Sequence, residues 1–313
     1  MTEMELVVRD IQPVARDVVA LTLAHPAGAE LPVWTPGAHI DLVLGADLVR
    51  QYSLCGRTGQ PGAWRVAVLR EQHGRGGSQA VHALSAGATV RVRGPRNHFP
   101  VEAAARYVFV AGGIGITPLL AMIYELAAAG ADWELHYGGR SRASMAFLDE
   151  LAQFGSRVRL WPADEVGLID LGAALGEARP GTHVYTCGPE PLLAAVEQRC
   201  GAGWPPGSLH LERFSPKHVD KPDEERALEV ELRRTGRTLV VRADQSIFDA
   251  VRGAGVSVLG SCLEGICGTC ETQVLDGEVD HRDSVLDDEE RAANDCMMIC
   301  VSRGRSERLV LDL

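Results

Sequence analysis

The chain has 313 residues, of which 46% are hydrophobic and 23% are charged, and its formal net charge is −11. This length and composition are typical of a soluble globular protein with two or three domains, and the acidic balance argues against binding to nucleic acid or to an anionic membrane. The first twenty residues alternate charged and aliphatic side chains, so we expect no signal peptide and a cytoplasmic protein.

The first hundred residues have the pattern of a β domain. Short alternating runs such as "HIDLVL" (39–44), "WRVAVLR" (64–70) and "TVRVRG" (89–94) are separated by turns rich in glycine and proline. Many short strands without helices between them predict an antiparallel barrel.

Two stretches of this β region offer groups suited to a flavin nucleotide. "RQYSL" (50–54) places a cation, an aromatic ring and a hydroxyl along one strand. "GRGGS" (74–78) adds a second cation and a glycine turn suited to phosphate. An aromatic ring beside two phosphate-type sites suits flavin mononucleotide (FMN), and the alternative is an ordinary strand and turn.

Beyond the β region, strands and helices alternate. The apolar run "YVFVAGG" (107–113) precedes the helical stretch "PLLAMIYELAAAG" (118–130), and strand patterns return at "WELHYGG" (133–139) and "HVYTCGP" (183–189). This alternation predicts a parallel sheet covered by helices on both faces. The longest nearly uncharged run, 107–124, contains the glycines and proline of a strand–helix junction, so we expect no membrane span.

Two loops of this region are suited to a pyridine nucleotide. "AGGIGITP" (111–118) follows a strand and opens a helix, where bare backbone and the helix start favour a pyrophosphate. It departs from G-x-G-x-x-G because Thr117 and Pro118 stand where a third glycine is expected. "TCGPEP" (186–191) ends a later strand, at the same carboxyl edge of the sheet where ligands of open α/β sheets bind.

The residues after the strand at 133–139 bear on the choice of nucleotide. Arg140, Ser141 and Arg142 stand where an acidic residue usually binds the ribose of NAD. An arginine there accepts a 2′-phosphate, so these residues by themselves favour NADPH.

A polar segment with two prolines, "SPKHVDKPDEERA" (215–227), predicts a linker to a small mixed α/β domain. Residues 223–313 hold 20 acidic and 11 basic residues, a balance of −9, whereas residues 1–222 hold 22 and 20, a balance of −2. This surplus suits a basic protein partner, and the alternative is that it serves solubility alone.

Four of the eight cysteines have the C-x4-C-x2-C spacing with a distant fourth cysteine that is typical of a plant-type [2Fe–2S] cluster: Cys262, Cys267, Cys270 and Cys300. Glycines in the loop allow backbone N–H groups to turn toward the sulfurs. A zinc site lacks its second close pair of ligands here, and a redox dithiol leaves Cys262 unexplained. Cys296 also lies near the fourth position and remains an alternative to Cys300.

The order "RQYSL", "GRGGS", "AGGIGITP", "CGPEPLL", "HLERF" and C-x4-C-x2-C resembles the phthalate dioxygenase reductase family, including reductases of vanillate O-demethylase systems, over essentially the whole chain. The resemblance implies an antiparallel β-barrel that binds FMN (1–102), an α/β parallel-sheet domain that binds NAD(P) (103–222), and an α+β ferredoxin domain with a β-grasp fold (223–313).

The resemblance also implies site residues. For FMN these are Arg50, Tyr52, Ser53, Arg75, Gly76, Gly77 and Ser78, with Thr117 and Phe214 bordering the flavin ring. For the nicotinamide nucleotide they are Gly112, Gly113, Gly115, Cys187, Gly188 and Pro189. Core packing is the alternative for Phe214. Cys187 is expected to position the nicotinamide rather than to act as a nucleophile, and no side chain is expected to act as a catalytic acid or base.

The implied function is that of a reductase component of an aromatic oxygenase or O-demethylase. NADH delivers two electrons as a hydride, a [2Fe–2S] cluster takes one at a time, and a flavin stands between them. The chain lacks the Cys and His pairs of a Rieske centre, so we expect oxygen activation on a separate terminal oxygenase of Rieske type that docks at the acidic ferredoxin domain. The family favours NADH, with NADPH possible.

Two other functions are compatible with part of the pattern. Similar three-part reductases donate electrons to cytochromes P450, which changes the partner but not the chemistry. A non-catalytic iron–sulfur redox sensor is the alternative from another class, and it leaves "RQYSL" and "TCGPEP" unexplained.

Overall fold

The computed structural model describes residues 3–45, 48–60, 62–201, 203–217 and 225–313. The chain forms two compact units, Met1–Phe214 and Ser215–Leu313. The expected linker at 215–227 therefore starts the second unit, and its residues 218–224, which include the expected boundary at 222/223, lie outside the described residues. In the described part of the chain, no helix has both the length and the apolarity needed to cross a bilayer.

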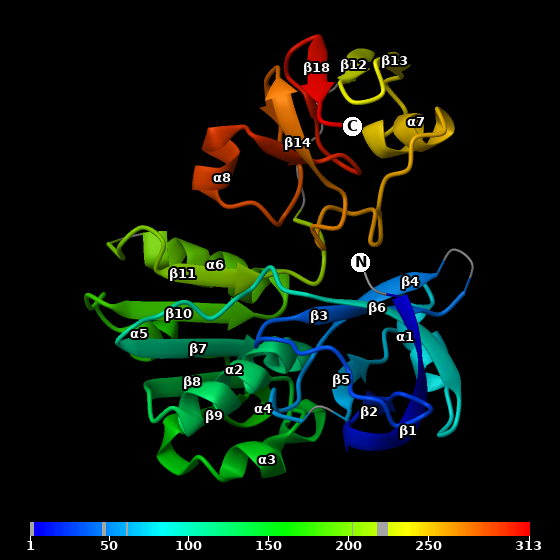
Figure 1. The fold of residues 1–313 in the computed structure, drawn as a ribbon. Helices are drawn as coiled ribbons and strands as arrows, with labels where there is room; N and C mark the ends of the chain where they lie inside the picture. The colour runs from blue at the N-terminus through cyan, green and yellow to red at the C-terminus, as the bar shows by residue number, and fades with distance from the viewer. Residues whose placement is uncertain (1–2, 46–47, 61, 202, 218–224) are drawn as a thin grey trace. The chain divides into compact units, whose positions relative to one another are not determined.

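The first unit begins with a six-stranded antiparallel barrel (Figure 1). The strand order is β4-β3-β6-β1-β2-β5, and a bridge between Leu54 and Val66 joins the two ends of the sheet. In β6, Val90 and Val92 are buried whereas Thr89 and Arg91 are exposed, which is the alternation expected of a strand with one face inside a barrel. The elements are β1 (Glu3–Ala15), β2 (Val18–Ala24), β3 (His39–Val43), β4 (Val49–Ser53), β5 (Trp64–Leu69), α1 (Gly77–His82) and β6 (Thr89–Arg96).

The rest of the first unit is a five-stranded parallel sheet with the order β11-β10-β7-β8-β9. One face is covered by α2, whose side chains are nearly all buried, and the other by α5 and α6. The strands are β7 (Arg106–Gly112), β8 (Asp132–Gly139), β9 (Val158–Pro162), β10 (Thr182–Cys187) and β11 (Leu209–Glu212). The helices are η1 (Gly113–Gly115), α2 (Ile116–Ala128), η2 (Arg142–Ser144), α3 (Leu148–Ala152), η3 (Gly155–Arg157), α4 (Ala163–Val166), α5 (Leu171–Leu175) and α6 (Glu190–Gly201).

The barrel and the parallel sheet share one hydrophobic core. Side chains of α2 pack in the same cluster as Val18, Ala20 and Ala67 of the barrel. Arg65 in β5 also donates two hydrogen bonds to Glu150 in α3, at 2.7 and 2.9 Å. These contacts fix the flavin-type barrel against the nucleotide-type sheet.

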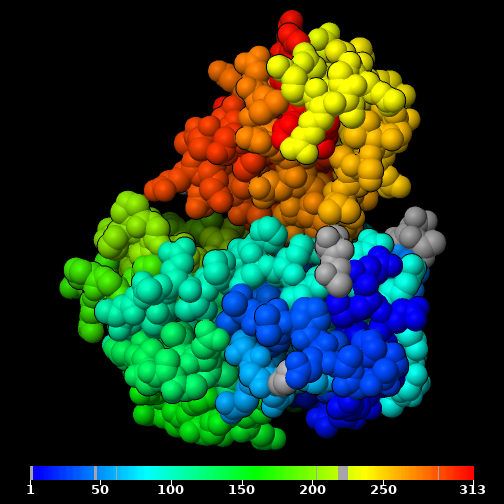
Figure 2. Space-filling view, in the orientation of Figure 1, coloured from blue at the N-terminus to red at the C-terminus, as the bar shows by residue number. Residues whose placement is uncertain are grey.

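The second unit is a small α+β body with its own core (Figures 1 and 2). Its five-stranded mixed sheet has the order β13-β12-β18-β14-β16, with β12 and β18 parallel, and α7 packs against it. The elements are β12 (Leu228–Leu232), β13 (Arg237–Val241), α7 (Ile247–Gly253), β14 (Glu271–Asp276), β15 (Val279–Asp280), α8 (Asp288–Ala293), β16 (Cys296–Met298), β17 (Arg303–Gly304) and β18 (Arg308–Leu311). The predicted fold class, an antiparallel barrel, a parallel α/β sheet and an α+β ferredoxin-type unit, is confirmed.

Candidate redox site

The glycine turn after β5 closes around the side chain of Arg50 in β4. Arg50 Nη2 donates a hydrogen bond to the carbonyl oxygen of Arg75 at 2.8 Å, and a Cβ on Gly77 would lie 2.3 Å from Arg50 Cγ. Gly76 has a φ of 80°, which favours glycine. The Ser78 hydroxyl is bound within the same turn, where it accepts a backbone N–H. "RQYSL" and "GRGGS" therefore lie together and present a guanidinium group beside bare backbone, which fits a phosphate.

Strand β4 also carries the aromatic and hydroxyl groups expected at a flavin. Burial raises the pKa of Tyr52 to about 12, so its phenol stays neutral at physiological pH. Ser53 is buried, and its side chain hydrogen-bonds to the carboxyl group of Glu212 in β11. A cation, a neutral aromatic ring and a hydroxyl thus follow one another on one strand, and this donor set fits FMN.

The two nucleotide loops are packed backbone against backbone. Strands β7 and β10 are parallel neighbours with Ala111 opposite Cys187, so both loops leave the same edge of the sheet. A Cβ on Gly115 would lie 2.2 Å from the Cys187 carbonyl oxygen, and a Cβ on Gly112 would lie 2.6 Å from Pro189 Cδ. A Cβ on Gly188 would in turn lie 3.0 Å from Gly112 Cα. Side chains at these glycines would separate the loops, and the bare surface that they form together fits a nicotinamide nucleotide.

Cys187 and Glu212 lie side by side at this edge. They are paired residues of β10 and β11, and Cys187 is fully buried. Two effects raise the pKa of the Cys187 thiol well above its usual value: burial, which is the larger, and the nearby Glu212 carboxyl. The sulfur is therefore a neutral packing group rather than a thiolate. Burial also raises the pKa of Glu212 to about 8, against a weaker opposing effect of the Ser53 hydrogen bond. Glu212 therefore holds a proton at pH 7.

Sequence reasoning missed Glu212. The residue belongs to the quoted "HLERF", but its partners Ser53 and Cys187 are distant in sequence and meet it only through the fold. One sequence signal pointed to it: an acidic residue at the carboxyl end of a short strand, on the edge where the two nucleotide loops lie. It joins the predicted flavin side to the predicted nicotinamide side.

The two residues expected to border the flavin ring differ in exposure. Thr117 is 2% exposed, and its hydroxyl donates to the Ile114 carbonyl oxygen at 3.0 Å within the glycine turn. Phe214 is 39% exposed, so the alternative that it is an ordinary core residue is wrong. An exposed phenylalanine at the end of β11 is available to a planar ligand.

Arg142, which by itself favoured NADPH, has a carboxylate partner. Its Nε lies 3.0 Å from both carboxylate oxygens of Glu165 in α4. The side chains of both Arg142 and Glu165 are exposed. The Glu165 carboxylate therefore competes with a 2′-phosphate for the guanidinium group, which remains accessible to solvent. Sequence spacing gave no sign of this competition.

Replacing Glu165 with glutamine should raise the kcat/KM for NADPH relative to NADH. Removal of the competing charge frees Arg142 for a phosphate, and because exposed ion pairs contribute up to about 1 kcal/mol we expect a two- to fivefold change in the ratio. Steady-state kinetics with both nucleotides measures it. Asp164→Asn removes the same charge from the same helix and is the matched control; an equal shift in both variants would contradict the role of the pair.

The four predicted cluster cysteines converge in the second unit. Cys262 lies beside Cys267 and Cys300, and Cys270 also lies beside Cys300, so the four thiols face one another. The backbone N–H groups of Glu264 and Ile266 also donate to the Cys262 sulfur, the first at 3.3 Å. Hydrogen bonds from the neighbouring cysteines are the largest cause of a lowered pKa at Cys262. Four convergent thiols with backbone donors fit a [2Fe–2S] cluster.

Cys296, the alternative fourth ligand, lies elsewhere. It begins β16 and lines a surface hollow with Glu271, Glu290 and Asp295. Burial is the main cause, and the negative charge of these acidic groups a further cause, of a rise in the pKa of its thiol to about 12. Within the described part of the chain, Cys296 makes no hydrogen bond to the four convergent cysteines, and its acidic surroundings disfavour a thiolate ligand.

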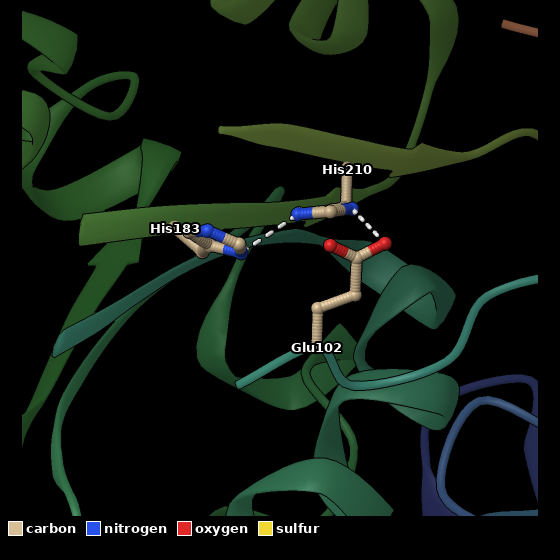
Figure 3. Close-up of side chains that lie close together, drawn as sticks. All are labelled: Glu102, His183 and His210. Carbon is tan, nitrogen blue, oxygen red and sulfur yellow. Dashed lines mark hydrogen bonds and ion pairs between the residues drawn. The ribbon is translucent and has the colours of Figure 1, made fainter. Parts of the chain in front are cut away.

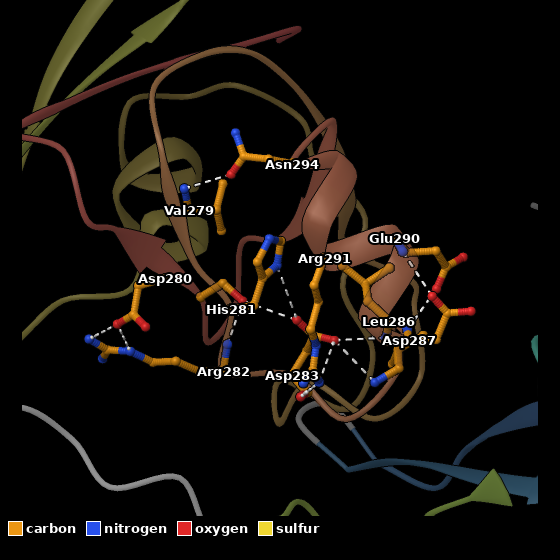
Figure 4. A network of polar contacts seen from close by, with 12 residues as sticks. Val279, Asp280, His281, Arg282, Asp283, Leu286, Asp287, Glu290, Arg291 and Asn294 are labelled. Carbon is orange, nitrogen blue, oxygen red and sulfur yellow. Dashed lines mark hydrogen bonds and ion pairs between the residues drawn. The ribbon is translucent and has the colours of Figure 1, made fainter. Parts of the chain in front are cut away.

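The buried carboxylate of Asp283 lies within a network of polar contacts (Figure 4), and its hydrogen bonds join the cysteine loop to the segment after Cys300. Its Oδ2 accepts backbone N–H groups of Val285 at 3.1 Å and Leu286 at 2.9 Å, and its Oδ1 accepts the Ser302 hydroxyl at 3.3 Å. The backbone N–H of the adjacent Ser284 donates a hydrogen bond to the carbonyl oxygen of Gly265. A Cβ atom on Gly265 would lie 3.0 Å from Asp283 Cα. Gly265 has a φ of 71°, so both its conformation and its close packing require glycine.

Asp283→Ala should destabilise the second unit by about 3 kcal/mol, because a buried backbone N–H, a partly buried backbone N–H and a buried hydroxyl lose their acceptor. Bleaching of the cluster absorbance in a urea titration measures the change, with an earlier midpoint expected for the variant. Asp276→Ala removes an exposed carboxylate from the same unit and should leave the midpoint unchanged. Equal midpoints for Asp283→Ala and the wild type would show that the network does not support the loop.

Comparisons with known proteins agree with this geometry. Residues 230–304 match the 2Fe-2S iron-sulfur cluster binding domain, and residues 109–198 match the oxidoreductase NAD-binding domain. The chain is 46% identical to phenoxybenzoate dioxygenase subunit beta of Ectopseudomonas oleovorans, over 96% of this chain and 94% of that protein. It is 38% identical to phthalate dioxygenase reductase of Burkholderia cepacia, over 96% of this chain and 95% of the relative.

The chain belongs to the phthalate dioxygenase reductase family. The family resemblance expected from the sequence is confirmed. As a phthalate dioxygenase reductase-family protein, the chain is an oxidoreductase that uses a pyridine nucleotide, FMN and a [2Fe–2S] cluster.

One solved structure shows this family module within a larger protein. An intact type IV self-sufficient cytochrome P450 monooxygenase superposes with a TM-score of 0.93 and 48% identity, over 99% of this chain. The chain spans 41% of that protein's length. A phthalate dioxygenase reductase-family fold therefore also occurs in a chain that carries a P450.

Proposed function

We propose that this protein is the reductase component of a multicomponent aromatic oxygenase or O-demethylase, and that it passes electrons from NADH through FMN and the [2Fe–2S] cluster to a Rieske-type terminal oxygenase. The observation that carries the proposal is the presence of three complementary sites in one chain. They are the Arg50–glycine cradle, the paired nucleotide loops and the four convergent cysteines.

Each group of residues has a defined task in this proposal. Bound FMN supplies the conversion from paired to single electrons. Arg50, Arg75 and the turn Gly76–Ser78 hold its phosphate, Tyr52 and Ser53 hold the ring side, and Thr117 and Phe214 border the ring. The loops with Gly112, Gly113, Gly115 and Cys187, Gly188, Pro189 place the nicotinamide, while Cys262, Cys267, Cys270 and Cys300 bind the iron. The expected domain limits, 1–102, 103–222 and 223–313, belong to the same proposal.

The proposal is tested on purified protein by a visible spectrum with flavin and iron quantitation. We expect one FMN and two irons per chain, and NADH-dependent reduction of a Rieske-type oxygenase. Protein that binds only one of the two prosthetic groups after reconstitution would overturn the proposal. We propose that the protein is cytoplasmic, because unpaired cysteine thiolates persist in a reducing compartment.

A cytochrome P450 is the second candidate partner, because of the similarity to the reductase portion of the self-sufficient P450 monooxygenase. Mixing the protein separately with a Rieske-type oxygenase and with a P450 distinguishes the two. Substrate-coupled NADH consumption with only the P450 would replace the first proposal by the second.

The partner is expected to dock on the acidic second unit. Its surface has a hollow of about 660 Å³ lined by Glu271, Glu289, Glu290 and Asp295 among others. Burial is the main cause of a raised pKa at Glu271, and the negative charges of Glu290 and Asp295 raise it further, as expected where like charges gather. This concentration of negative charge supports a basic docking face on the partner.

Oxygenase reduction should therefore slow several-fold as ionic strength rises from about 0.05 to 0.5 M, because salt screens attraction between exposed charges. Stopped-flow mixing of reduced protein with oxidised oxygenase measures the rate. Reduction of the flavin by NADH in the absence of the partner is the control for a general salt effect. A partner rate that does not change with salt would remove the acidic surface from docking.

A further inference from the structure

Two histidines and a glutamate meet on one face of the parallel sheet (Figure 3). His183 lies in β10, His210 lies in the neighbouring strand β11, and Glu102 lies in the segment between β6 and β7. His210 Nε2 is 2.9 Å from His183 Nδ1, and His210 Nδ1 is 4.0 Å from Glu102 Oε1. One nitrogen or oxygen from each residue lies within 4.8 Å of the other two. The redox proposal uses none of these three side chains.

Tyr185 holds the cluster in place. It pairs with His210 in the β10–β11 register, and the two rings stack with centroids 4.4 Å apart and an interplanar angle of 11°. The Tyr185 hydroxyl accepts the backbone N–H of Glu102 at 2.8 Å. One rigid aromatic side chain therefore fixes both the His210 ring and the backbone that carries Glu102.

The donor set is that of a borderline transition-metal site. Two imidazoles and a carboxylate suit zinc and its neighbours in the first transition row, whereas magnesium and calcium require oxygen ligands. The histidines are half-buried and Glu102 is exposed, so an ion can enter from solvent and keep water in the remaining positions. Burial is the main cause of a lowered pKa at His210, which makes it a neutral ligand at pH 7.

The two imidazole rings must move to accept an ion. The two ring nitrogens that face each other share one proton across 2.9 Å, whereas ligand nitrogens of a tetrahedral zinc site are about 3.3 Å apart. A metal ion would replace that proton after the rings part and turn so that both nitrogen lone pairs point at the ion. The exposed Glu102 side chain has the freedom to reach the ion directly or to orient His210 through Nδ1.

We propose that Glu102, His183 and His210 form a binding site for one divalent transition-metal ion of the zinc type, separate from the iron–sulfur centre. The ion would join β11 to the segment that connects the barrel to the parallel sheet. Strand β11 continues from His210 to Glu212 at the redox site, with both side chains on the same face of the strand. A metal ion bound at this site would therefore lie close enough to affect the edge of the sheet where the nucleotide loops lie.

Equilibrium dialysis of the holoprotein against micromolar zinc chloride tests the proposal, with zinc and iron measured together. The wild type should bind one equivalent of zinc without loss of iron, and it should not bind magnesium at the same concentration. His183→Gln and His210→Gln should weaken zinc binding by about 10- to 100-fold, and Glu102→Gln by about tenfold. His25→Gln, a histidine of the barrel, is the matched control and should bind like the wild type.

Unchanged zinc binding in all three site variants, or no bound zinc in the wild type, would overturn the proposal. Glu102→Gln alters an exposed side chain, so it keeps the test valid if a histidine variant folds poorly, and flavin and iron content check every variant. Copper(II) provides a second readout, because its electron paramagnetic resonance signal reports the number of nitrogen ligands. Two nitrogens are expected in the wild type and one in His210→Gln; identical signals in the two proteins would contradict the site.

Discussion

Cys267→Ser should leave NADH-dependent reduction of the flavin within about twofold of the wild type and lower electron delivery to the oxygenase by at least about a hundredfold. The two halves of this result separate because Cys267 lies in the second compact unit, whereas the flavin and nucleotide residues lie in the first. Loss of one of four thiolates removes the cluster or its normal redox behaviour. Stopped-flow absorbance of flavin reduction and steady-state oxygenase turnover measure the two steps.

Cys296→Ser is the matched control for this experiment. It makes the same chemical change in the same unit, but its sulfur faces the acidic hollow rather than the four convergent cysteines. We expect normal iron content and normal delivery. If Cys267→Ser delivered electrons at the wild-type rate, the cluster would not lie on the path; if Cys296→Ser lost its iron, the assignment of Cys300 as the fourth ligand would be wrong.

Much of this site could be predicted from the sequence, because each of its loops carries a local pattern of its own. The C-x4-C-x2-C loop carries three predicted ligands within nine residues, and this spacing predicts the chemistry of the site. The loops at 111–118 and 186–191 are far apart in sequence, but each ends a parallel strand. Parallel strands end at a common edge, and the register of Ala111 with Cys187 places the two loops in contact.

What the sequence did not reveal depends on pairs of residues brought together by packing. Burial raises the pKa of Glu212, and the opposing hydroxyl of Ser53 comes from a distant barrel strand that meets β11 only in the folded chain. Arg142 looked like a phosphate ligand until Glu165, 23 residues later, was placed beside it. Asp283 is one of many acidic residues in a strongly acidic region, and only its burial shows that it holds the cysteine loop.

Domain limits depend on packing in the same way. The linker pattern at 215–227 lies where the second unit begins. Among the described residues, the barrel and the parallel sheet are not separated in this way. The nearly buried helix α2 belongs to a hydrophobic core that also includes barrel residues. Composition distinguishes the strand-rich first hundred residues from the alternating region, but it does not reveal that the two share side-chain contacts such as Arg65 with Glu150.

We expect Glu212 to influence the contact between the flavin and the nicotinamide. It hydrogen-bonds to Ser53 on the predicted flavin side and lies beside Cys187 on the predicted nicotinamide side. Its other oxygen, Oε2, is buried and has no hydrogen-bond partner among the described residues. A neutral carboxyl group is compatible with that position, whereas a carboxylate there would need water or a counter-charge.

Glu212→Ala should therefore slow flavin reduction by NADH by about 10- to 100-fold, because it leaves a cavity and removes the partner of Ser53. In the wild type the same rate should fall as pH rises through about 8, since the raised pKa means that Glu212 is neutral below this value and charged above it. Glu212→Gln imitates the protonated form, so it should keep most of the rate and lose this pH dependence. Stopped-flow flavin reduction between pH 6 and 10 measures all three proteins. If the glutamine variant retained the fall near pH 8, another group would be responsible for it, and Glu212 would have a purely structural role.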